Sequence, residues 1–198
     1  MPIISAILTA AGESTRMGQF KPLLRWRGTS LVEHQINSLV DGGASDVVVV
    51  LGHGSEEVRS QICSSHATIV LNTHYRLGKT TSVRAGLRSI NPQADVVLLM
   101  AVDQPRTDEI IRTVIDAHVK AGSLITSPRY RSHGGHPLAF STSLKGELKR
   151  ISEQRQGIRE VFQAHRHDVN EVEIDDPMIL LDLNTRLEYE QAFERYGI

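Results

Sequence analysis

Short runs of apolar residues alternate along the chain with segments whose apolar positions recur at helical spacing. Ile3–Leu8, Asp46–Leu51 and Asp95–Val102 are the clearest apolar runs, and their length and β-branched residues are typical of buried strands in a parallel sheet. Leu31–Leu39 and Asp108–Val119 show the helical pattern. Strands that alternate with helices in this way predict an α/β fold with a mainly parallel sheet.

The rest of the chain continues this alternation. The further predicted strands are Ala67–Asn72, Ser123–Ser127, Leu138–Phe140, Asp168–Glu173 and Met178–Leu181. The further predicted helices are Glu56–Ile62, one that follows Gly78 and runs to about Ile90, Leu144–Ile151, Gly157–Ala164 and Leu187–Tyr196. Between these elements, residues 128–137 are predicted to be a polar loop, and the insertion from Pro128 to about Gly157 should add an antiparallel element beside the site. The chain has 198 residues, which predicts a single domain spanning residues 1–198.

A glycine-containing turn follows the first predicted strand. It begins at Thr9-Ala10-Ala11-Gly12 and continues through Ser14 and Arg16 to Lys21. Small side chains leave main-chain N–H groups free to surround an anion, while Arg16 and Lys21 supply a planar guanidinium and a compact ammonium. The turn therefore indicates a polyphosphate site. The alternative is an ordinary strand-to-helix turn with two solvated cations, since the residues match neither the dinucleotide glycine pattern nor the P-loop.

Polar residues also follow two later strands. Asp103 comes directly after the apolar strand Asp95–Val102, and Asp182 and Asn184 follow Met178–Leu181. Ligands of open α/β sheets bind beyond the carboxyl ends of the strands, so Asp103 should face the same crevice as the glycine turn. Oxygen ligands from these two segments would suit Mg²⁺. The alternative for Asp103 is a helix cap or a turn aspartate, and the alternative for the later pair is a solvated turn before the last helix.

Composition narrows the function classes. The chain has 22 Lys and Arg against 23 Asp and Glu, a formal net charge of -1, which argues against a dedicated nucleic-acid binder. Cys63 is the sequence's one cysteine, so no internal disulfide is possible. Neither a signal-peptide pattern nor a membrane-length apolar run is present, and we expect a cytoplasmic protein without a membrane segment.

The glycine turn resembles the signature loop of the MobA-like nucleotidyltransferases, the family that includes enzymes of molybdenum cofactor synthesis. The matching positions are Ala10-Ala11-Gly12, Ser14, Arg16-Met17-Gly18, Lys21 and Leu23-Leu24. The resemblance continues, in matching order, through Gly78–Leu87, Asp103-Gln104-Pro105, Gly135-His136-Pro137 and Asp182-Leu183-Asn184-Thr185. It implies a three-layer α/β/α, Rossmann-like fold similar to the nucleotide-diphospho-sugar transferases.

The resemblance also implies roles for individual residues in Mg²⁺-dependent nucleotidyl transfer. Arg16 and Lys21 would hold the triphosphate, and Asp103 would bind the metal together with Asp182 or Asn184. The implied nucleotide-binding residues are Thr9, Ala10, Ala11, Gly12, Ser14, Arg16, Lys21, Gly78, Thr81 and Ser82. The implied acceptor-binding residues are Gly135, His136 and Pro137. The sequence departs from the usual family pattern at two places, the segment from Thr80 to Val83 and the single residue Asn184.

The substrates follow from finer features of the resemblance. Ala-Ala-Gly in the turn and Asp-Gln-Pro after the strand resemble the cytidylyltransferase branch, which implies CTP and a molybdopterin-type acceptor, with a molybdoenzyme or its chaperone as a possible partner. Two alternatives stay open. One is an enzyme that transfers a nucleotide to a sugar or alcohol phosphate, and the other is a catalytically silent protein that binds a nucleotide and delivers cofactor.

Overall fold

A mixed sheet forms the middle of the molecule. The computed structural model describes residues 2–15 and 17–198. Within them, an eight-stranded sheet has the spatial order β10 (Val169–Glu173), β7 (Ile125–Tyr130), β9 (Leu138–Ser141), β6 (Val96–Ala101), β1 (Ile4–Ala10), β4 (Asp46–Leu51) and β5 (Ala67–Leu71), with β8 (His133–Gly134) paired to β7. A separate two-stranded sheet joins β2 (Arg25–Trp26) to β3 (Thr29–Ser30).

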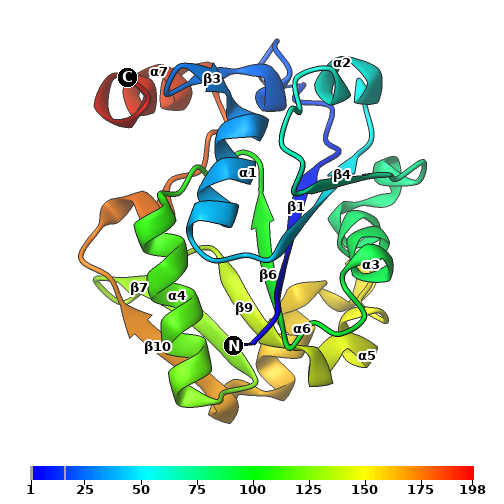
Figure 1. Ribbon diagram of the computed structural model, residues 1–198, viewed down its shortest axis with the longest axis vertical. Coiled ribbons are helices and arrows are strands. Elements are labelled where there is room, and N and C mark those ends of the chain that lie inside the picture. The colour runs from blue at the N-terminus through cyan, green and yellow to red at the C-terminus, as the bar shows by residue number, and fades with distance from the viewer. Residues whose placement is uncertain (1, 16) are drawn as a thin grey trace.

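Helices cover both faces of the large sheet (Figure 1). They are α1 (Leu31–Asp41), α2 (Ser55–Arg59), α3 (Lys79–Ser89), α4 (Asp108–Ala121), α5 (Lys145–Leu148), α6 (Ile158–Ala164) and α7 (Arg186–Tyr196). This is the three-layer α/β/α, Rossmann-like arrangement that the family resemblance implies. No helix among the described residues is long and apolar enough to cross a membrane.

Alternate side chains of the central strands build two hydrophobic cores. In β1, Ala6 and Leu8 point to one face and Ile7 to the other, and all three are fully buried. The first core also takes apolar residues of α1, α4 and α7, and the second takes residues of α3, α5 and α6. Strands that are buried on both faces need the nearly continuous apolar runs seen in the sequence.

The sheet reverses its winding at β1. β1 pairs in parallel with β4 on one side and with β6 on the other, with Thr9 opposite Ala101. The Val102 N–H donates to the Thr9 carbonyl at 2.9 Å, so the chain leaves both strands at the same edge. A crevice at such a reversal is where open α/β sheets bind ligands.

The predicted antiparallel element is confirmed. β9 pairs antiparallel with both β6 and β7, and it therefore joins the central parallel strands to the parallel pair β7 and β10. The preceding segment is less loop-like than predicted, because β7 continues to Tyr130 and His133–Gly134 forms β8.

The strand predicted at Met178–Leu181 is wrong. Pro177–Leu180 is a 3-10 helix, and the Asp176 carboxylate caps it by accepting from the Met178 N–H at 2.8 Å. Met178 and Ile179 are buried, so their apolar character reflects packing under the end of the sheet rather than a strand. The helix predicted at Glu56–Ile62 is shorter than expected and ends at Arg59.

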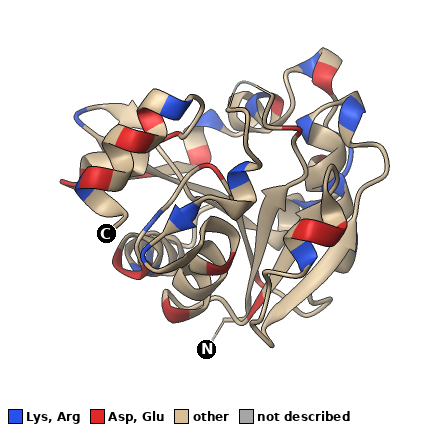
Figure 2. Cartoon of the chain, turned by 90° about the horizontal axis from the view of Figure 1, so that it is seen from above, with Lys and Arg blue, Asp and Glu red and all other residues tan. Residues whose placement is uncertain are grey.

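The C-terminal helix is tied to the hairpin formed by β2 and β3, which the sequence analysis missed. Arg27 in the hairpin turn donates its main-chain N–H to the Gly197 carbonyl at 2.7 Å and its Nε–H to the Tyr196 carbonyl at 2.9 Å. The Tyr189 hydroxyl donates to the Arg25 carbonyl at 2.9 Å. Figure 2 shows acidic and basic residues interspersed along α7 and around the rest of the molecule.

Candidate active site

A cavity of about 300 Å³ opens where β1 and β6 end. The predicted nucleotide-binding residues that line it are Thr9, Ala10, Ala11, Gly12, Ser14, Lys21, Gly78 and Ser82. Asp103 and Asn184 line it as well. Two lining residues to which the sequence analysis gave no role are Tyr75 and Lys79. Arg16 lies outside the described residues.

The turn after β1 closes on itself through Ser14. Its main-chain carbonyl accepts from the Met17 N–H at 2.9 Å, and its hydroxyl accepts from the Lys21 N–H at 3.0 Å. Ser14 adopts a positive φ of 54°, an uncommon conformation for a residue with a side chain. These bonds place Lys21 at the mouth of the cavity.

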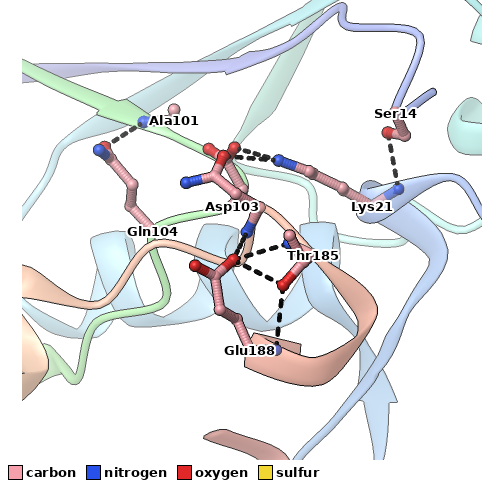
Figure 3. A network of polar contacts seen from close by, with 8 residues as sticks. Ser14, Lys21, Ala101, Asp103, Gln104, Thr185 and Glu188 are labelled. Atoms are coloured by element: carbon pink, nitrogen blue, oxygen red, sulfur yellow. Dashed lines mark hydrogen bonds and ion pairs between the residues drawn. The ribbon is translucent and has the colours of Figure 1, made fainter. Parts of the chain in front are cut away.

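Lys21 and Asp103 meet across the cavity. The Lys21 Nζ lies 2.7 Å from the Asp103 carboxylate and 3.2 Å from the Asn184 side-chain oxygen (Figure 3). The Lys21 and Asp103 side chains are only 12% and 22% exposed. The spatial proximity on which the sequence interpretation depends is therefore present, because the glycine turn and the end of β6 face one crevice.

Asn184 reaches the cavity although the segment before it is a 3-10 helix rather than the predicted strand Met178–Leu181. The Leu183 N–H donates to the Asp103 carbonyl at 2.8 Å, which holds the two segments together. The Glu188 carboxylate then accepts from the Asn184 N–H at 2.9 Å and from the Thr185 N–H at 2.7 Å (Figure 3), as part of a capping box at the start of α7. Asp182, in contrast, is exposed and does not line the cavity.

The donor set around Lys21 fits a small, hard cation. A carboxylate and an amide carbonyl are the oxygen ligands that Mg²⁺ accepts, and both already converge on the positive charge of the Lys21 ammonium. Among the described residues, no group of three or more His, Cys, Asp and Glu side chains converges as a metal site. A metal bound by Asp103 and Asn184 would therefore complete its shell with phosphate oxygens and water.

The second predicted nucleotide loop is braced by a residue that the sequence analysis did not single out. The Asn72 side-chain amide is buried and donates to the Thr81 hydroxyl at 2.8 Å and to the Ser82 hydroxyl at 3.0 Å. Thr81 in turn donates to the Gly78 carbonyl at 2.8 Å and does not line the cavity. These hydrogen bonds hold the start of α3 beside the cavity, with Ser82 lining it and Thr81 supporting the turn.

A second cavity of about 410 Å³ adjoins the first through Lys79, which lines both. His136 lines this second cavity, whereas Gly135 and Pro137 line neither. Gly135 packs so closely against the Ile179 carbonyl that a Cβ atom would collide with it. Of the three predicted acceptor-binding residues, His136 is therefore the one that the structure places beside a cavity.

Arg106 holds together the segments around His136, and the sequence analysis did not single it out. Its guanidinium is fully buried and donates to the carbonyls of Pro105, His136, Ile179 and Leu181 at 2.7 to 2.9 Å. Burial lowers the pKa of Arg106 to about 10, which leaves it charged at neutral pH. An arginine after a proline carries no sequence signal for such burial, because most arginines are solvated.

Comparison with known proteins agrees with this geometry. Residues 6–169 match the model of the MobA-like NTP transferase domain. The molybdenum cofactor cytidylyltransferase of Escherichia coli K12 is 30% identical over 199 residues, which cover 99% of this chain and 98% of the relative. The nicotine blue oxidoreductase of Paenarthrobacter nicotinovorans is 29% identical over 73% of this chain and 74% of the relative.

Solved structures show the same fold. The Rv0371c protein of Mycobacterium tuberculosis H37Rv is 28% identical, with a TM-score of 0.84 and coverage of 98% of both chains. A further crystal structure of Rv0371c, described as a complex with manganese, is 26% identical with a TM-score of 0.78, and the alignment covers 97% of this chain and 98% of that one.

Proposed function

Because the chain belongs to the MobA-like NTP transferase family, and is thus a nucleotidyltransferase, we propose that it transfers a nucleotide from CTP to a molybdopterin-type cofactor and releases pyrophosphate. The observation that carries this proposal is the convergence of Lys21, Asp103 and Asn184 in the cavity beyond β1 and β6. Full-length similarity to a molybdenum cofactor cytidylyltransferase supports the choice of substrates. A molybdoenzyme, or the chaperone that loads one, is the partner expected to receive the product.

The proposed reaction requires the protein mainly to position the two substrates and to neutralise their negative charge. An acceptor phosphate is already anionic when it attacks the α-phosphorus, so no general base is needed. Ala10, Ala11 and Gly12 would let the nucleotide lie against the main chain. Lys21 would move from Asp103 to the triphosphate and stabilise the charge that builds up on the departing pyrophosphate.

Asp103 and Asn184 would hold the metal ion. When bound, Mg²⁺ supplies positive charge against the phosphate oxygens. The description of the relative Rv0371c as a manganese complex supports a divalent cation in this family. Asp182, which is exposed, would affect such an ion only through its charge at longer range.

The test is pyrophosphate release from a panel of nucleoside triphosphates with Mg²⁺, using molybdopterin cofactor and several sugar and alcohol phosphates as acceptors. We expect turnover with CTP and molybdopterin cofactor, and a loss of about 100-fold or more in both Lys21→Ala and Asp103→Ala. Lys120→Ala and Asp116→Ala, at exposed positions of α4, serve as matched controls and should keep full activity.

The panel also separates the alternatives. Preference for GTP would overturn the nucleotide assignment and leave the reaction class intact, and turnover with a sugar or alcohol phosphate would replace the acceptor. Undiminished pyrophosphate release by both site variants would refute the catalytic roles given to Lys21 and Asp103. A complete lack of turnover with every pair would favour the alternative of a protein that binds a nucleotide and delivers cofactor.

A further inference from the structure

The orientation of the Gln104 side-chain amide is determined by its neighbours. Its Oε1 lies 3.1 Å from the main-chain nitrogen of Ala101, which can only donate (Figure 3). Its Nε2 therefore points away from Ala101 and lies 3.1 Å from Nδ1 of His136. Gln104 is only 8% exposed, so reversing the amide would leave buried donors facing each other without acceptors.

This orientation fixes the protonation of the His136 ring. An amide nitrogen only donates, so Nδ1 must be the unprotonated nitrogen and the ring proton must sit on Nε2. The pKa of His136 is lowered to about 4, chiefly by burial and also by the nearby charges of Arg106 and Lys79, which the charges of Asp182 and Asp103 oppose. The ring is thus neutral at physiological pH.

The Nε2–H of His136 remains for a ligand. It has no hydrogen-bond partner among the described residues, and His136 lines the second cavity. Lys79 and Arg159 line the same cavity against the single carboxylate of Glu153. A neutral N–H donor beside two cations favours an anionic oxygen as its partner.

We propose that Gln104 holds His136 in the Nε2–H tautomer and so makes it a hydrogen-bond donor to an anionic oxygen of the acceptor substrate. Gln104 is a positioning residue, since it acts through His136. The assignment of the donor to the acceptor substrate rests on the proposed nucleotidyl transfer, whereas the tautomer does not.

The tautomer is measured by long-range ¹H–¹⁵N spectroscopy of the uniformly labelled full chain at neutral pH. The chain has nine histidines, and the ring signal of His136 is identified by its absence in His136→Asn. We expect a protonated Nε2 and an unprotonated Nδ1. A protonated Nδ1 in the wild-type protein would overturn the proposal, whatever the activity of the enzyme.

Gln104→Glu keeps the hydrogen bond from the Ala101 N–H but reverses the direction of the hydrogen bond to His136. A glutamate at this position still accepts from Ala101, but it can only accept from His136, so the proton should appear on Nδ1. Gln93→Glu adds the same charge at an exposed position and should leave the His136 signals unchanged. Persistence of the Nε2–H tautomer in Gln104→Glu would contradict the role of Gln104.

The ligand contact is probed by titrating inorganic phosphate into wild type, Gln104→Glu and Gln93→Glu while the His136 ring is observed. We expect phosphate to shift the wild-type Nε2–H signal, and binding at this signal to weaken about tenfold or more in Gln104→Glu only. In Gln104→Glu, the value of kcat/KM for the acceptor should fall together with phosphate binding. The affinity for the nucleotide should stay unchanged, which checks that the variant is folded. If the His136 signals do not respond to phosphate, its role as a donor is wrong. If the spectra are as expected but the enzyme shows no turnover, only the proposed function is contradicted.

Discussion

At the scale of single residues, Lys21 is the informative side chain. Its ammonium lies where the oxygens of Asp103 and Asn184 converge, which is the position that the proposed reaction needs for a metal ion. Without a positive charge between them, the Asp103 carboxylate oxygen and the Asn184 amide oxygen would repel one another or bind water. Entry of a metal ion at this point requires Lys21 to move away.

Lys21→Met should therefore raise the Mg²⁺ affinity of the nucleotide-free protein about fivefold, because the metal no longer competes with a partly buried ion pair worth about 1 kcal/mol. Isothermal titration calorimetry measures this affinity, with Lys120→Met as the control. Weaker or unchanged Mg²⁺ binding by Lys21→Met would show that the ammonium and the metal do not share a position.

At the scale of elements, Arg106 links three chain segments that meet beside the site. It bonds to carbonyls at the end of the β6 loop, in the turn before β9 and in the 3-10 helix Pro177–Leu180. Gln35 on α1 reinforces this junction, since its side chain donates to the Gln104 carbonyl at 2.6 Å and accepts from the Arg106 N–H at 3.1 Å.

Arg106→Lys should lower the free energy of unfolding by about 3 kcal/mol or more, because a lysine keeps the charge but cannot supply the planar fork to several carbonyls. Urea denaturation followed by circular dichroism measures the change. Arg112→Lys is the control, since Arg112 makes one exposed contact to the Asp41 carbonyl. A loss below about 1 kcal/mol in Arg106→Lys would mean that the junction holds without the guanidinium.

The sequence predicts the elements around the site better than those that close it. Thr9–Gly12 and Asp103 are recognisable because each directly follows a strand that is apolar on both faces, and parallel strands bring such ends to one edge. Met178 and Ile179 form an apolar run as well, but four residues cannot distinguish a strand from a packed turn without knowledge of their tertiary partners. The same limit hides Arg106 and Gln104, whose roles depend on segments distant in the chain.

At the scale of the whole molecule, stability should depend on pH through half-buried histidines. Burial lowers the pKa of His34 in the folded protein from 6.5 to about 4, with Arg27 acting in the same direction. Between these values the unfolded chain binds more protons than the folded one, so folding stability is lost as the pH falls from about 6.5 towards 4. Above that window this contribution is constant.

His34→Gln should remove part of this slope, up to about 3 kcal/mol across the window. Urea unfolding at a series of pH values measures it, and His66→Gln, which removes an exposed histidine, is the control. An identical pH slope in His34→Gln and the wild type would assign the dependence to other groups.

The bonds between α7 and the hairpin at residues 25–30 have a practical consequence for handling the protein. A fusion partner placed after Ile198 would begin next to Tyr196 and Gly197, whose carbonyls accept hydrogen bonds from Arg27 in the segment that follows Lys21. An affinity tag ahead of Pro2 would instead leave the molecule where β1 begins, at the edge of the sheet opposite to the candidate active site (Figure 1). Purification handles and surface immobilisation for the binding measurements therefore belong at the N-terminus.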